Sequence, residues 1–484
     1  MNKSHLDTLL DLDSRYPTPL VCEVLAKEEN AKLLDYVVKD PFGCHVFPGD
    51  IEDYPISAFH ADMEVEVGKA ERIHLWAYIP TCRYKCHFCQ FPTVILNPDS
   101  AKAGALFSEV VDLNIKEAQM WLEHVPSLSR TPVGEFNIFG GTPSLLPEAE
   151  LRRLMAFYKE NFNFSSATLR FEGEPGSLPE NYLAILKELG FTKLSFGAQS
   201  FNDRLIHACG RRHTAAECFS TLENAKAMGY ELITIDLMYG LMGQKVDDVA
   251  YDMEMVKKYD LSHVVCTKLH MKEFMETRSG VSAKRKNLWQ RKLISLGDNE
   301  MPSLGKQYQM RQLVESYLAD DYLEHPTMYF HKRDLPPEKW KSLITDLDKQ
   351  YPEVAIGLGG SSKSRRSEMI NLTEYDEYRD ALNAGRLPCG SVRGFSPHQQ
   401  RVNAFKMALS TLIPVDDAVY KKRFDGESFF DNPTISAALT HLEAKGLVTV
   451  DNAVVTLSPE GRVLVEAIIN TQFETASLTP HGVG

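Results

Sequence analysis

Cys82-Arg83-Tyr84-Lys85-Cys86-His87-Phe88-Cys89 places three cysteines within eight residues, in the spacing C-x3-C-x2-C. The apolar run at 73–80 comes directly before it and predicts a buried strand. Thiolates on a loop that leaves a strand hold soft metals at the mouth of a sheet or barrel. Three thiolates leave one iron of a four-iron cluster without a protein ligand, so that iron is open to chemistry.

A zinc site and coincidence are the alternatives to an iron–sulfur cluster at this cysteine group. A structural zinc site needs four ligands and usually pairs two C-x2-C groups, whereas this chain has one compact group. His87, which stands between the cysteines, is poorly placed to complete a tetrahedron around zinc. Coincidence has to be considered because the chain has nine cysteines. The spacing favours the iron–sulfur cluster and leaves both alternatives open.

The size and charge of the chain restrict its class. Its 484 residues can form two or three domains, and a composition of 43% hydrophobic and 25% charged residues is that of a globular protein. The formal net charge of −13 argues against general nucleic-acid binding, which needs a basic surface. No apolar run approaches about 20 residues, so we expect no membrane span. Residues 1–7 lack the apolar core of a signal peptide.

The remaining cysteines bear on the compartment. They are scattered through the chain, at Cys22, Cys44, Cys209, Cys218, Cys266 and Cys389. This distribution argues against a disulfide framework and predicts a reducing, cytoplasmic location.

From about residue 72 the pattern alternates between strand and helix. Strands are predicted over 73–80, 135–139, 167–171, 193–198, 232–237 and 263–269, with helices between them. About six strand–helix units at this spacing indicate parallel strands joined by right-handed crossovers. The chemically suggestive residues fall where strands end, as they do in barrel-type α/β enzymes. We therefore expect an α/β fold whose core is a partial (β/α)6 barrel with an open side.

The rest of the chain divides around this core. Residues 1–70 are expected to be an N-terminal extension that packs on the main domain, and 71–300 the barrel. Residues 301–395 are expected to be a helical and loop extension of the core, and 396–484 a separate C-terminal domain. In that domain three helices precede a predicted hairpin over 447–457, which is a winged-helix-like pattern. Its acidic balance favours packing or partner contact over DNA binding.

Two further segments have more than one interpretation. Residues 270–300 are locally basic, which indicates either a solvated helix face or a flap that meets an anionic substrate. Residues 357–362 are glycine-rich and predict a tight turn rather than an anion-binding nest.

Five further motifs follow the cysteines in order. They are Gly140-Gly141-Thr142-Pro143-Ser144, Phe171-Glu172-Gly173-Glu174-Pro175, Leu194-Ser195-Phe196-Gly197-Ala198-Gln199-Ser200-Phe201, Gly210-Arg211-Arg212-His213-Thr214 and Ile235-Asp236-Leu237-Met238-Tyr239-Gly240-Leu241. With the cysteine group, they resemble radical S-adenosylmethionine (SAM) enzymes of the oxygen-independent coproporphyrinogen III oxidase-like family, which includes heme-chaperone relatives. The resemblance is strong over about 73–270 and looser over about 396–470. It implies a radical SAM barrel with a C-terminal α+β winged-helix-like domain.

The resemblance also implies roles for residues. It places a 4Fe–4S cluster at Cys82, Cys86 and Cys89, and one or two SAM molecules beside it. The implied SAM contacts are Gly140, Gly141, Thr142, Glu172, Gln199, Arg211 and Asp236. Of these, Glu172, Gln199 and Arg211 are also expected to serve catalysis. Considered singly, an acidic residue at a strand end is as often a helix N-cap, so the ordered recurrence of the motifs carries the assignment.

The reaction that the resemblance implies is reductive cleavage of SAM. An electron reaches the sulfonium through the cluster, the S–C5′ bond breaks, and methionine and a 5′-deoxyadenosyl radical result. The radical then abstracts hydrogen from a small-molecule substrate. The implied enzyme is of oxidoreductase or methyltransferase type, with an electron donor such as flavodoxin or ferredoxin as its partner.

Three departures from the porphyrinogen-oxidising members affect the expected substrate. Those members typically have Tyr-x-His-Ile-Pro before the first cysteine, where this chain has Trp76-Ala77-Tyr78-Ile79-Pro80. Gln90 stands in place of their extra cysteine, and Phe139 in place of the first glycine of their triple glycine. We therefore rank a tailoring or methyl-transfer reaction on a natural product, sugar or similar metabolite first. Tetrapyrrole or heme chemistry comes second, and a heme or cluster carrier without turnover is a further alternative.

Overall fold

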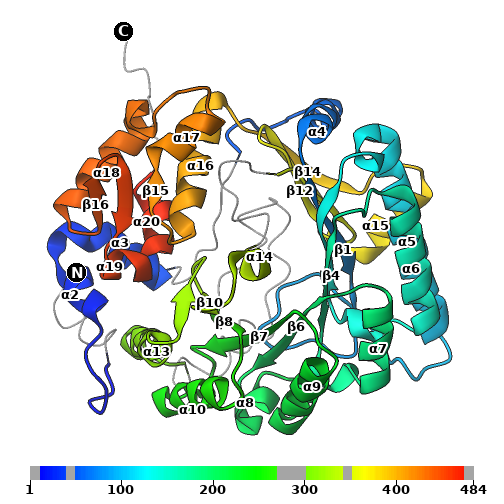
Figure 1. The fold of residues 1–484 in the computed structure, drawn as a ribbon, viewed down its shortest axis with the longest axis horizontal. Helices are drawn as coiled ribbons and strands as arrows, with labels where there is room; N and C mark the ends of the chain where they lie inside the picture. Colours follow the sequence, from blue (N-terminus) through cyan, green and yellow to red (C-terminus); the bar gives the residue numbers. More distant parts are fainter. Residues whose placement is uncertain (1–10, 40–48, 270–300, 342–350, 474–484) are drawn as a thin grey trace.

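The computed structural model describes residues 11–39, 49–269, 301–341 and 351–473. In these residues one curved sheet of 12 strands forms the centre, and helices cover its convex side (Figure 1). None of the described helices combines the length and the hydropathy that a membrane crossing requires. The basic segment at 270–300 lies outside the described residues, so its two interpretations stay open.

Six parallel strands form the barrel wall. They are β1 (Ile73–Ile79), β4 (Val133–Gly140), β5 (Thr168–Gly173), β6 (Lys193–Gln199), β7 (Leu232–Tyr239) and β8 (His263–Lys268), adjacent in that order. The crossover helices are α5 (Ala103–His124), α6 (Glu148–Asn161), α7 (Glu180–Glu188), α9 (Ala215–Ala227) and α10 (Val246–Lys258). The short α8 (Asp203–Ala208) follows β6. The structure thus confirms the partial (β/α)6 barrel expected from the sequence.

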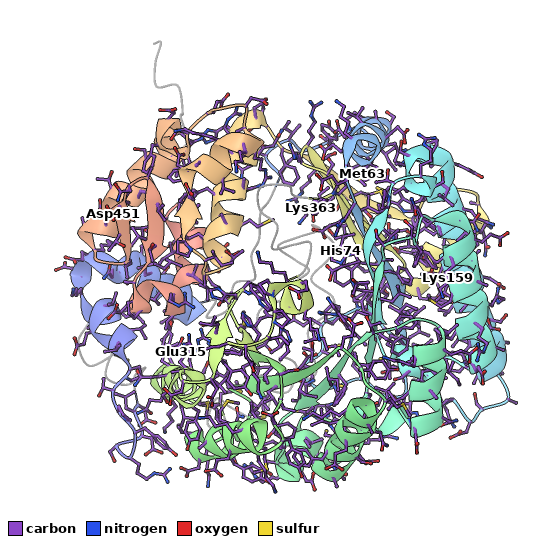
Figure 2. The ribbon with its side chains drawn as sticks, viewed as in Figure 1. Met63, His74, Lys159, Glu315, Lys363 and Asp451 are labelled. Atoms are coloured by element: carbon purple, nitrogen blue, oxygen red, sulfur yellow. The ribbon has the colours of Figure 1, made fainter. Side chains whose placement is uncertain are left out.

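The two faces of the barrel sheet differ in chemistry because alternate strand residues face opposite sides. The convex face is apolar and fully buried under the helices, as at Leu75, Phe136, Phe171 and Phe196. The concave face carries polar and aromatic residues, which we call the barrel lumen: His74 (labelled in Figure 2), Trp76, Glu135, Asn137, Phe139, Arg170, Glu172, Lys193, Ser195, Thr234, Asp236 and His263. Polar and aromatic side chains, rather than an apolar core, therefore line the inside of the barrel, and the cavity at its mouth reaches Glu172, Ser195 and Asp236.

Short strands extend the barrel sheet at both edges. Beyond β1 lie β11 (Glu353–Ile356), which is parallel to it, and then β12 (Ser361–Lys363), β13 (Ser367–Asn371) and β14 (Cys389–Gly394). Beyond β8 lie β10 (Tyr329–Lys332) and β9 (Tyr322–Glu324). The helices of this part are α13 (Leu304–Leu318), α14 (Pro337–Trp340) and α15 (Tyr375–Asn383). The helix-and-loop prediction for 301–395 is therefore corrected: strands of three to six residues are too short for a visible alternation of polar and apolar residues.

The C-terminal part has the expected three helices followed by a hairpin. The helices are α16 (Pro397–Ser410), α17 (Asp417–Arg423) and α18 (Pro433–Ala444); the hairpin is β16 (Val448–Asp451) and β17 (Val454–Leu457), with β15 (Val415–Asp416) alongside and α19 (Pro459–Val463) and α20 (Val465–Thr471) after it. Asn452 and Ala453 both have positive φ, as a type I′ hairpin turn requires.

The N-terminal residues divide between the two cores. The short helices α2 (Leu20–Ala26) and α3 (Ala31–Lys39) share an apolar core with the C-terminal helices. By contrast, α4 (Ile56–Lys69) packs on the barrel core through Phe59, Met63 and Val67. Only part of this segment therefore packs on the main domain, and the rest packs on the C-terminal domain.

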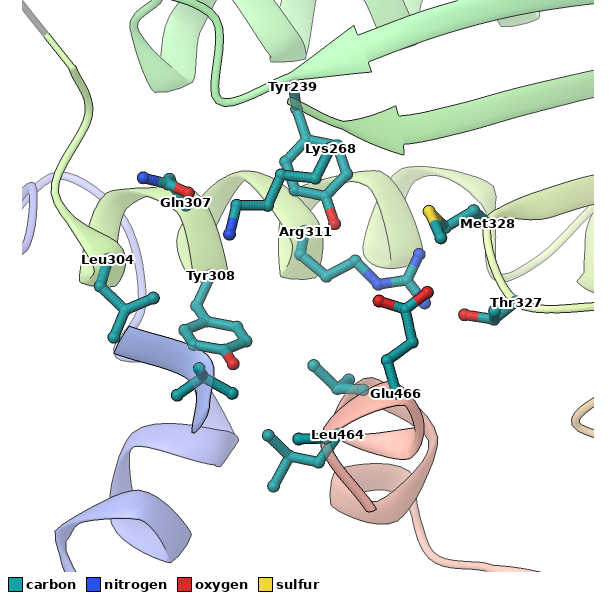
Figure 3. A pocket seen from close by; sticks show the side chains of 13 residues that line it. Tyr239, Lys268, Leu304, Gln307, Tyr308, Arg311, Thr327, Met328, Leu464 and Glu466 are labelled. Atoms are coloured by element: carbon teal, nitrogen blue, oxygen red, sulfur yellow. The ribbon is translucent and has the colours of Figure 1, made fainter. Parts of the chain in front are cut away.

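A buried charged cluster joins the C-terminal domain to the barrel, beside a small pocket that Arg311 and Glu466 line (Figure 3). Arg311 of α13 lies 2.6 Å from Glu324 and 3.0 Å from Glu315. Arg462 of α19 donates to the backbone carbonyl of Glu324 at 3.2 Å. The cavity here is about 30 Å³, which is room for about one water molecule. It is therefore a junction between domains rather than a site for a substrate.

Candidate functional site

One cavity at the carboxyl ends of the barrel strands brings the predicted site residues together. All ten line it: Cys82, Cys86, Cys89, Gly140, Gly141, Thr142, Glu172, Gln199, Arg211 and Asp236. The volume of this cavity is about 180 Å³. The carboxyl ends of parallel strands meet at one edge of a sheet, so residues far apart in the sequence converge here.

The cysteine loop is held in place from two sides. Its first residues pair as β2 (Thr81–Cys82) with β3 (Val94–Ile95), which follows the loop. His87 donates its backbone N–H to the carbonyl of Cys209 at 2.8 Å, and its Nδ1 lies 2.9 Å from the carbonyl of Ala208. The imidazole Nδ1 thus faces backbone rather than the cysteines, as expected for a residue that is not a zinc ligand.

The three thiols do not form a compact single-ion site. No group of three or more His, Cys, Asp or Glu side chains in the described residues is close enough together to hold one ion. A structural zinc ion needs its ligands in one tetrahedron. A four-iron cube instead spreads three thiolates over three iron atoms, so its ligands stand farther apart.

The glycine turn after β4 lies against the first cysteine. Gly141 donates to the carbonyl of Ile79 at 2.8 Å, and Thr142 donates to that of Thr81 at 2.7 Å. A Cβ at Gly141 would lie 2.9 Å from the sulfur of Cys82 and 2.6 Å from the Thr81 carbonyl oxygen. Only glycine therefore fits between this turn and the cysteine loop.

The hydroxyl of Thr142 donates to the sulfur of Cys82 at 3.5 Å. Burial raises the pKa of the Cys82 thiol to about 12, and the Thr142 hydrogen bond acts in the opposite direction. Burial thus favours the protonated thiol. A bound metal would favour the thiolate instead, because a coordinating thiol loses its proton outright. The turn thus supplies a hydrogen bond to the thiolate that cluster binding would create.

Gln199 has an uncommon backbone conformation at the end of β6. Its φ is +69°, and the pairing of β6 with β7 shifts register between Gly197 and Gln199. A Cβ at Gly197 would lie 2.2 Å from Nε2 of Gln199, so the missing side chain makes room for the amide. Such strained positions are concentrated at ligand sites, where surrounding structure holds them.

Two carboxyl groups face the lumen below the cysteine loop. Burial and the nearby Asp236 together raise the pKa of Glu172 to about 7, although Arg170 acts in the opposite direction. Burial also raises the pKa of Asp236 to about 6, while Arg170, Arg211 and the Ser195 hydroxyl, 3.5 Å away, lower it. Perturbed carboxyl groups in a cavity are typical of a site that receives a charged or polar ligand.

Arg211 connects the cysteines to a group of residues that received no role from the sequence. Its Nη2 lies 3.7 Å from Glu174 Oε1, and its Nη1 lies 3.7 Å from the sulfur of Cys86. Tyr84 of the cysteine loop donates to the same oxygen of Glu174, and His213 lies 3.5 Å from it. Burial alone would raise the pKa of Glu174, but His213 and Arg211 outweigh it and leave it lowered. Glu174 is therefore an ionised anchor for the loop.

The residues present fit both implied groups. Three thiols on one loop are the ligand set of a cluster with one open iron. The cavity beside them carries an amide, two carboxyl groups and a guanidinium. A cation such as a sulfonium and a carboxylate both find groups of opposite charge here.

Comparison with known proteins agrees with this fold. The Radical SAM superfamily family model matches residues 76–256. A structure of coproporphyrinogen III oxidase (HemN) from Escherichia coli, a radical SAM enzyme, superposes with a TM-score of 0.73 over 87% of this chain and 94% of that chain, at 19% identity. Residues 76–256 therefore match the radical SAM superfamily, and membership in that superfamily implies a 4Fe–4S cluster and SAM.

Within that class, the chain is similar along most of its length to the oxygen-independent coproporphyrinogen III oxidase-like proteins, which include heme chaperones. The heme chaperone HemW of Bacillus subtilis is 25% identical over 394 residues, which cover 80% of this chain and 96% of that protein. The oxygen-independent coproporphyrinogen III oxidase of Pseudomonas aeruginosa is 24% identical over 420 residues, which cover 82% of this chain and 84% of that protein.

Proposed function

We propose that this radical SAM enzyme acts on a tetrapyrrole. The observation that carries the radical chemistry is the convergence of all ten predicted residues on one cavity. The names of the relatives, coproporphyrinogen III oxidase and heme chaperone, support the tetrapyrrole. This reverses the order expected from the sequence, which ranked a tailoring or methyl-transfer reaction first.

In this proposal Cys82, Cys86 and Cys89 hold a 4Fe–4S cluster. When bound and reduced by a one-electron donor of the flavodoxin or ferredoxin class, the cluster supplies the electron that splits SAM into methionine and a 5′-deoxyadenosyl radical. The Tyr84–Glu174 hydrogen bond and the Gly141 turn keep the thiols in position.

The remaining predicted residues orient SAM. Arg211 pairs with the carboxylate of its methionine part, and Gln199 and the Gly140–Thr142 turn contact the amino acid end. Asp236 accepts hydrogen bonds from ribose hydroxyls, and Glu172 holds the positively charged end through its carboxylate. Catalysis depends on this orientation, since the radical must form next to the substrate hydrogen and away from water.

The aromatic side chains of the barrel lumen support a substrate that has aromatic rings. Trp76 and Phe139 are half-buried on its wall, with ring centroids 4.8 Å apart, and Tyr329 at the far edge is 37% exposed. Aromatic side chains that are exposed in a hollow bind flat rings through their faces and edges.

A second candidate is a heme carrier, favoured by the similarity to heme chaperone HemW along most of the chain. A carrier would bind heme in one-to-one ratio without consuming SAM. The intact set of cavity residues favours the enzyme, because a carrier has no need of a SAM site.

The test is anaerobic incubation of the reconstituted protein with SAM, a strong reductant and coproporphyrinogen III. Mass spectrometry would follow 5′-deoxyadenosine and the tetrapyrrole. We expect 5′-deoxyadenosine to accumulate faster with the tetrapyrrole than without it, with a change in tetrapyrrole mass. SAM cleavage that no tetrapyrrole accelerates or accompanies would contradict the proposed substrate. Stoichiometric heme binding without 5′-deoxyadenosine would favour the carrier.

A further inference from the structure

The arginine at the centre of the barrel lumen is not used by the proposed SAM site. Arg170 lies on β5, two residues before Glu172 and on the same face of the strand. Its strand neighbours are Asn137 on β4 and Lys193 on β6. Asn137 in turn pairs with Trp76 on β1, so these four residues form one row across the sheet. Arg170 therefore stands in the row of lumen residues one step below Glu172.

Arg170 is the one lumen cation without a carboxylate partner among the described residues. It forms no ion pair within 4 Å there, and its Nε is buried without a hydrogen-bond acceptor. By contrast, Lys193 lies 4.0 Å from Glu135, and Arg211 lies 3.7 Å from Glu174. A guanidinium has five N–H donors, and their natural partner is a carboxylate.

We propose that Arg170 binds a carboxylate of the substrate, and that the substrate is an acid with aromatic rings lying in the barrel lumen. This deepens, and rests on, the proposed function, because the pyrrole rings of a tetrapyrrole are each flat and aromatic and bear carboxylate side chains. Fixing the substrate by such a group would hold its ring below the residues assigned to SAM.

A second hydrogen-bond donor without a partner faces the same space. The hydroxyl of Tyr329, on β10, makes no hydrogen bond within the parts of the chain that the structure describes, and the residue is 37% exposed. Its ring centroid lies 6.0 Å from that of His263, and it shares the electrostatic environment of Arg170 and Asp236. The Tyr329 hydroxyl and Arg170 thus offer two donors for one carboxylate, next to the aromatic wall of Trp76 and Phe139.

A purely structural role would make Arg170 a counter-charge for Glu172 and Asp236. It does favour ionisation of both, but neither carboxylate comes within the 4 Å of an ion pair. A counter-charge would be replaced adequately by lysine and would not distinguish one ligand from another. A carboxylate-binding arginine would be replaced poorly by lysine, because the planar fork is lost, and would distinguish acids from neutral analogues.

The experiment compares acids with neutral analogues in anaerobic equilibrium dialysis of the reconstituted full-length protein with SAM. The probes are coproporphyrin III, 1-pyrenebutyrate and its neutral analogue 1-pyrenebutanol. The variants are Arg170→Gln and Arg170→Lys, with Arg152→Gln as the control. Arg152 lies on the outer surface, where it pairs with Glu148 and Glu188. Circular dichroism and cluster iron content would verify that each variant is folded and loaded.

We expect Arg170→Gln to weaken binding of both acids by about 10- to 100-fold, the range for a charge-assisted pair. The affinity of Arg170→Lys for the acids should lie between those of Arg170→Gln and the wild type. Neither substitution should change the affinity for pyrenebutanol, and Arg152→Gln should bind all three probes as the wild type does. Acids that bind Arg170→Gln as tightly as the wild type would overturn the proposal.

The outcomes separate this inference from the proposed function. Pyrenebutyrate binding that depends on Arg170, without coproporphyrin III binding, would support the carboxylate site and contradict the tetrapyrrole. Coproporphyrin III binding that does not depend on Arg170 would support the tetrapyrrole and contradict the carboxylate site. If neither acid bound the wild type, both the carboxylate site and the proposed tetrapyrrole substrate would be overturned.

Discussion

Nη1 of Arg211 lies 3.7 Å from the sulfur of Cys86, while Nη2 of the same guanidinium lies 3.7 Å from Glu174. One cation therefore touches both a proposed cluster ligand and the residue that anchors the cysteine loop. Because it is buried, its charge acts on the thiolate with little screening by solvent.

Arg211→Gln should weaken SAM binding by about 10- to 100-fold, since a charge-assisted hydrogen bond to a carboxylate contributes roughly 1.5–3 kcal/mol. It should also make the cluster harder to reduce, because a positive charge beside a ligand sulfur is removed. Equilibrium dialysis with SAM and a redox titration followed by electron paramagnetic resonance would measure the two effects. An unchanged affinity and an unchanged midpoint potential together would show that Arg211 has neither role.

Gly141→Ala should abolish stable cluster loading. The added Cβ would lie 2.6 Å from the carbonyl oxygen of Thr81 and 2.9 Å from the sulfur of Cys82, so the turn and the cysteine loop must separate. Iron and sulfide analysis after anaerobic reconstitution would measure this. Gly104→Ala is the matched control, because its Cβ would meet nothing within 4 Å. Full iron content in Gly141→Ala would show that the close contact is dispensable.

Tyr84→Phe should loosen the cysteine loop without removing a ligand. It deletes the hydrogen bond to Glu174, and a hydrogen bond to a charged group contributes roughly 1.5–3 kcal/mol. We expect the variant to lose cluster iron to a chelator about ten times faster than the wild type. Tyr251→Phe, on the exposed surface of α10, is the control. Equal rates of iron loss for Tyr84→Phe and the wild type would argue against Glu174 as an anchor.

Glu172 should make the cofactor-free protein less stable as pH rises. Its pKa of about 7 in the folded chain lies above the ordinary value of 4.5, mainly because of burial. The stabilisation from its protonated form is complete below about pH 4.5 and is lost as pH rises through about 7.

Glu172→Gln does not titrate, so its free energy of unfolding relative to wild type should increase by about 1–3 kcal/mol between pH 5 and pH 8. Thermal unfolding at several pH values would measure the difference, with the exposed Glu160→Gln as the control. A difference that is independent of pH would mean that the Glu172 pKa is not raised.

Glu117 of α5 should be essential for attaching β11, β13 and α15 to the barrel. Its carboxyl group accepts from the Gly357 N–H at 2.9 Å, the Asn371 amide at 2.7 Å and the Tyr378 hydroxyl at 2.7 Å, all buried. Glu117→Ala leaves three buried donors without an acceptor and should cost about 2–5 kcal/mol of unfolding free energy. Denaturant unfolding would measure it against Glu123→Ala on the exposed face of the same helix, and equal stability of the two variants would refute the role.

The sequence was sufficient for the barrel and for the residues that converge on the cavity. Cys82, Glu172 and Asp236 all follow or end predicted strands, and parallel strands bring such positions to one edge of a sheet. The C-terminal helices and hairpin could be predicted for a similar reason, since their patterns are local.

Other features could not be predicted because they depend on contacts between distant segments. Glu174 stands in a quoted motif, but its importance comes from Tyr84, 90 positions earlier in the chain. Arg170 shares the Glu172 side of its strand, so an alternation of side chains could have indicated it, yet its lack of a partner is visible only in three dimensions. The strands at 353–394 are short and pair with a barrel edge that the sequence does not reveal.

The central claim is that Cys82, Cys86 and Cys89 hold a cluster that cleaves SAM reductively. The most direct measurement is 5′-deoxyadenosine by mass spectrometry after anaerobic reconstitution and reduction in the presence of SAM, for the wild type and Cys86→Ala. We predict 5′-deoxyadenosine from the wild type and none from the variant. A wild-type protein that takes up no iron–sulfur cluster, or equal 5′-deoxyadenosine from both proteins, would contradict the claim.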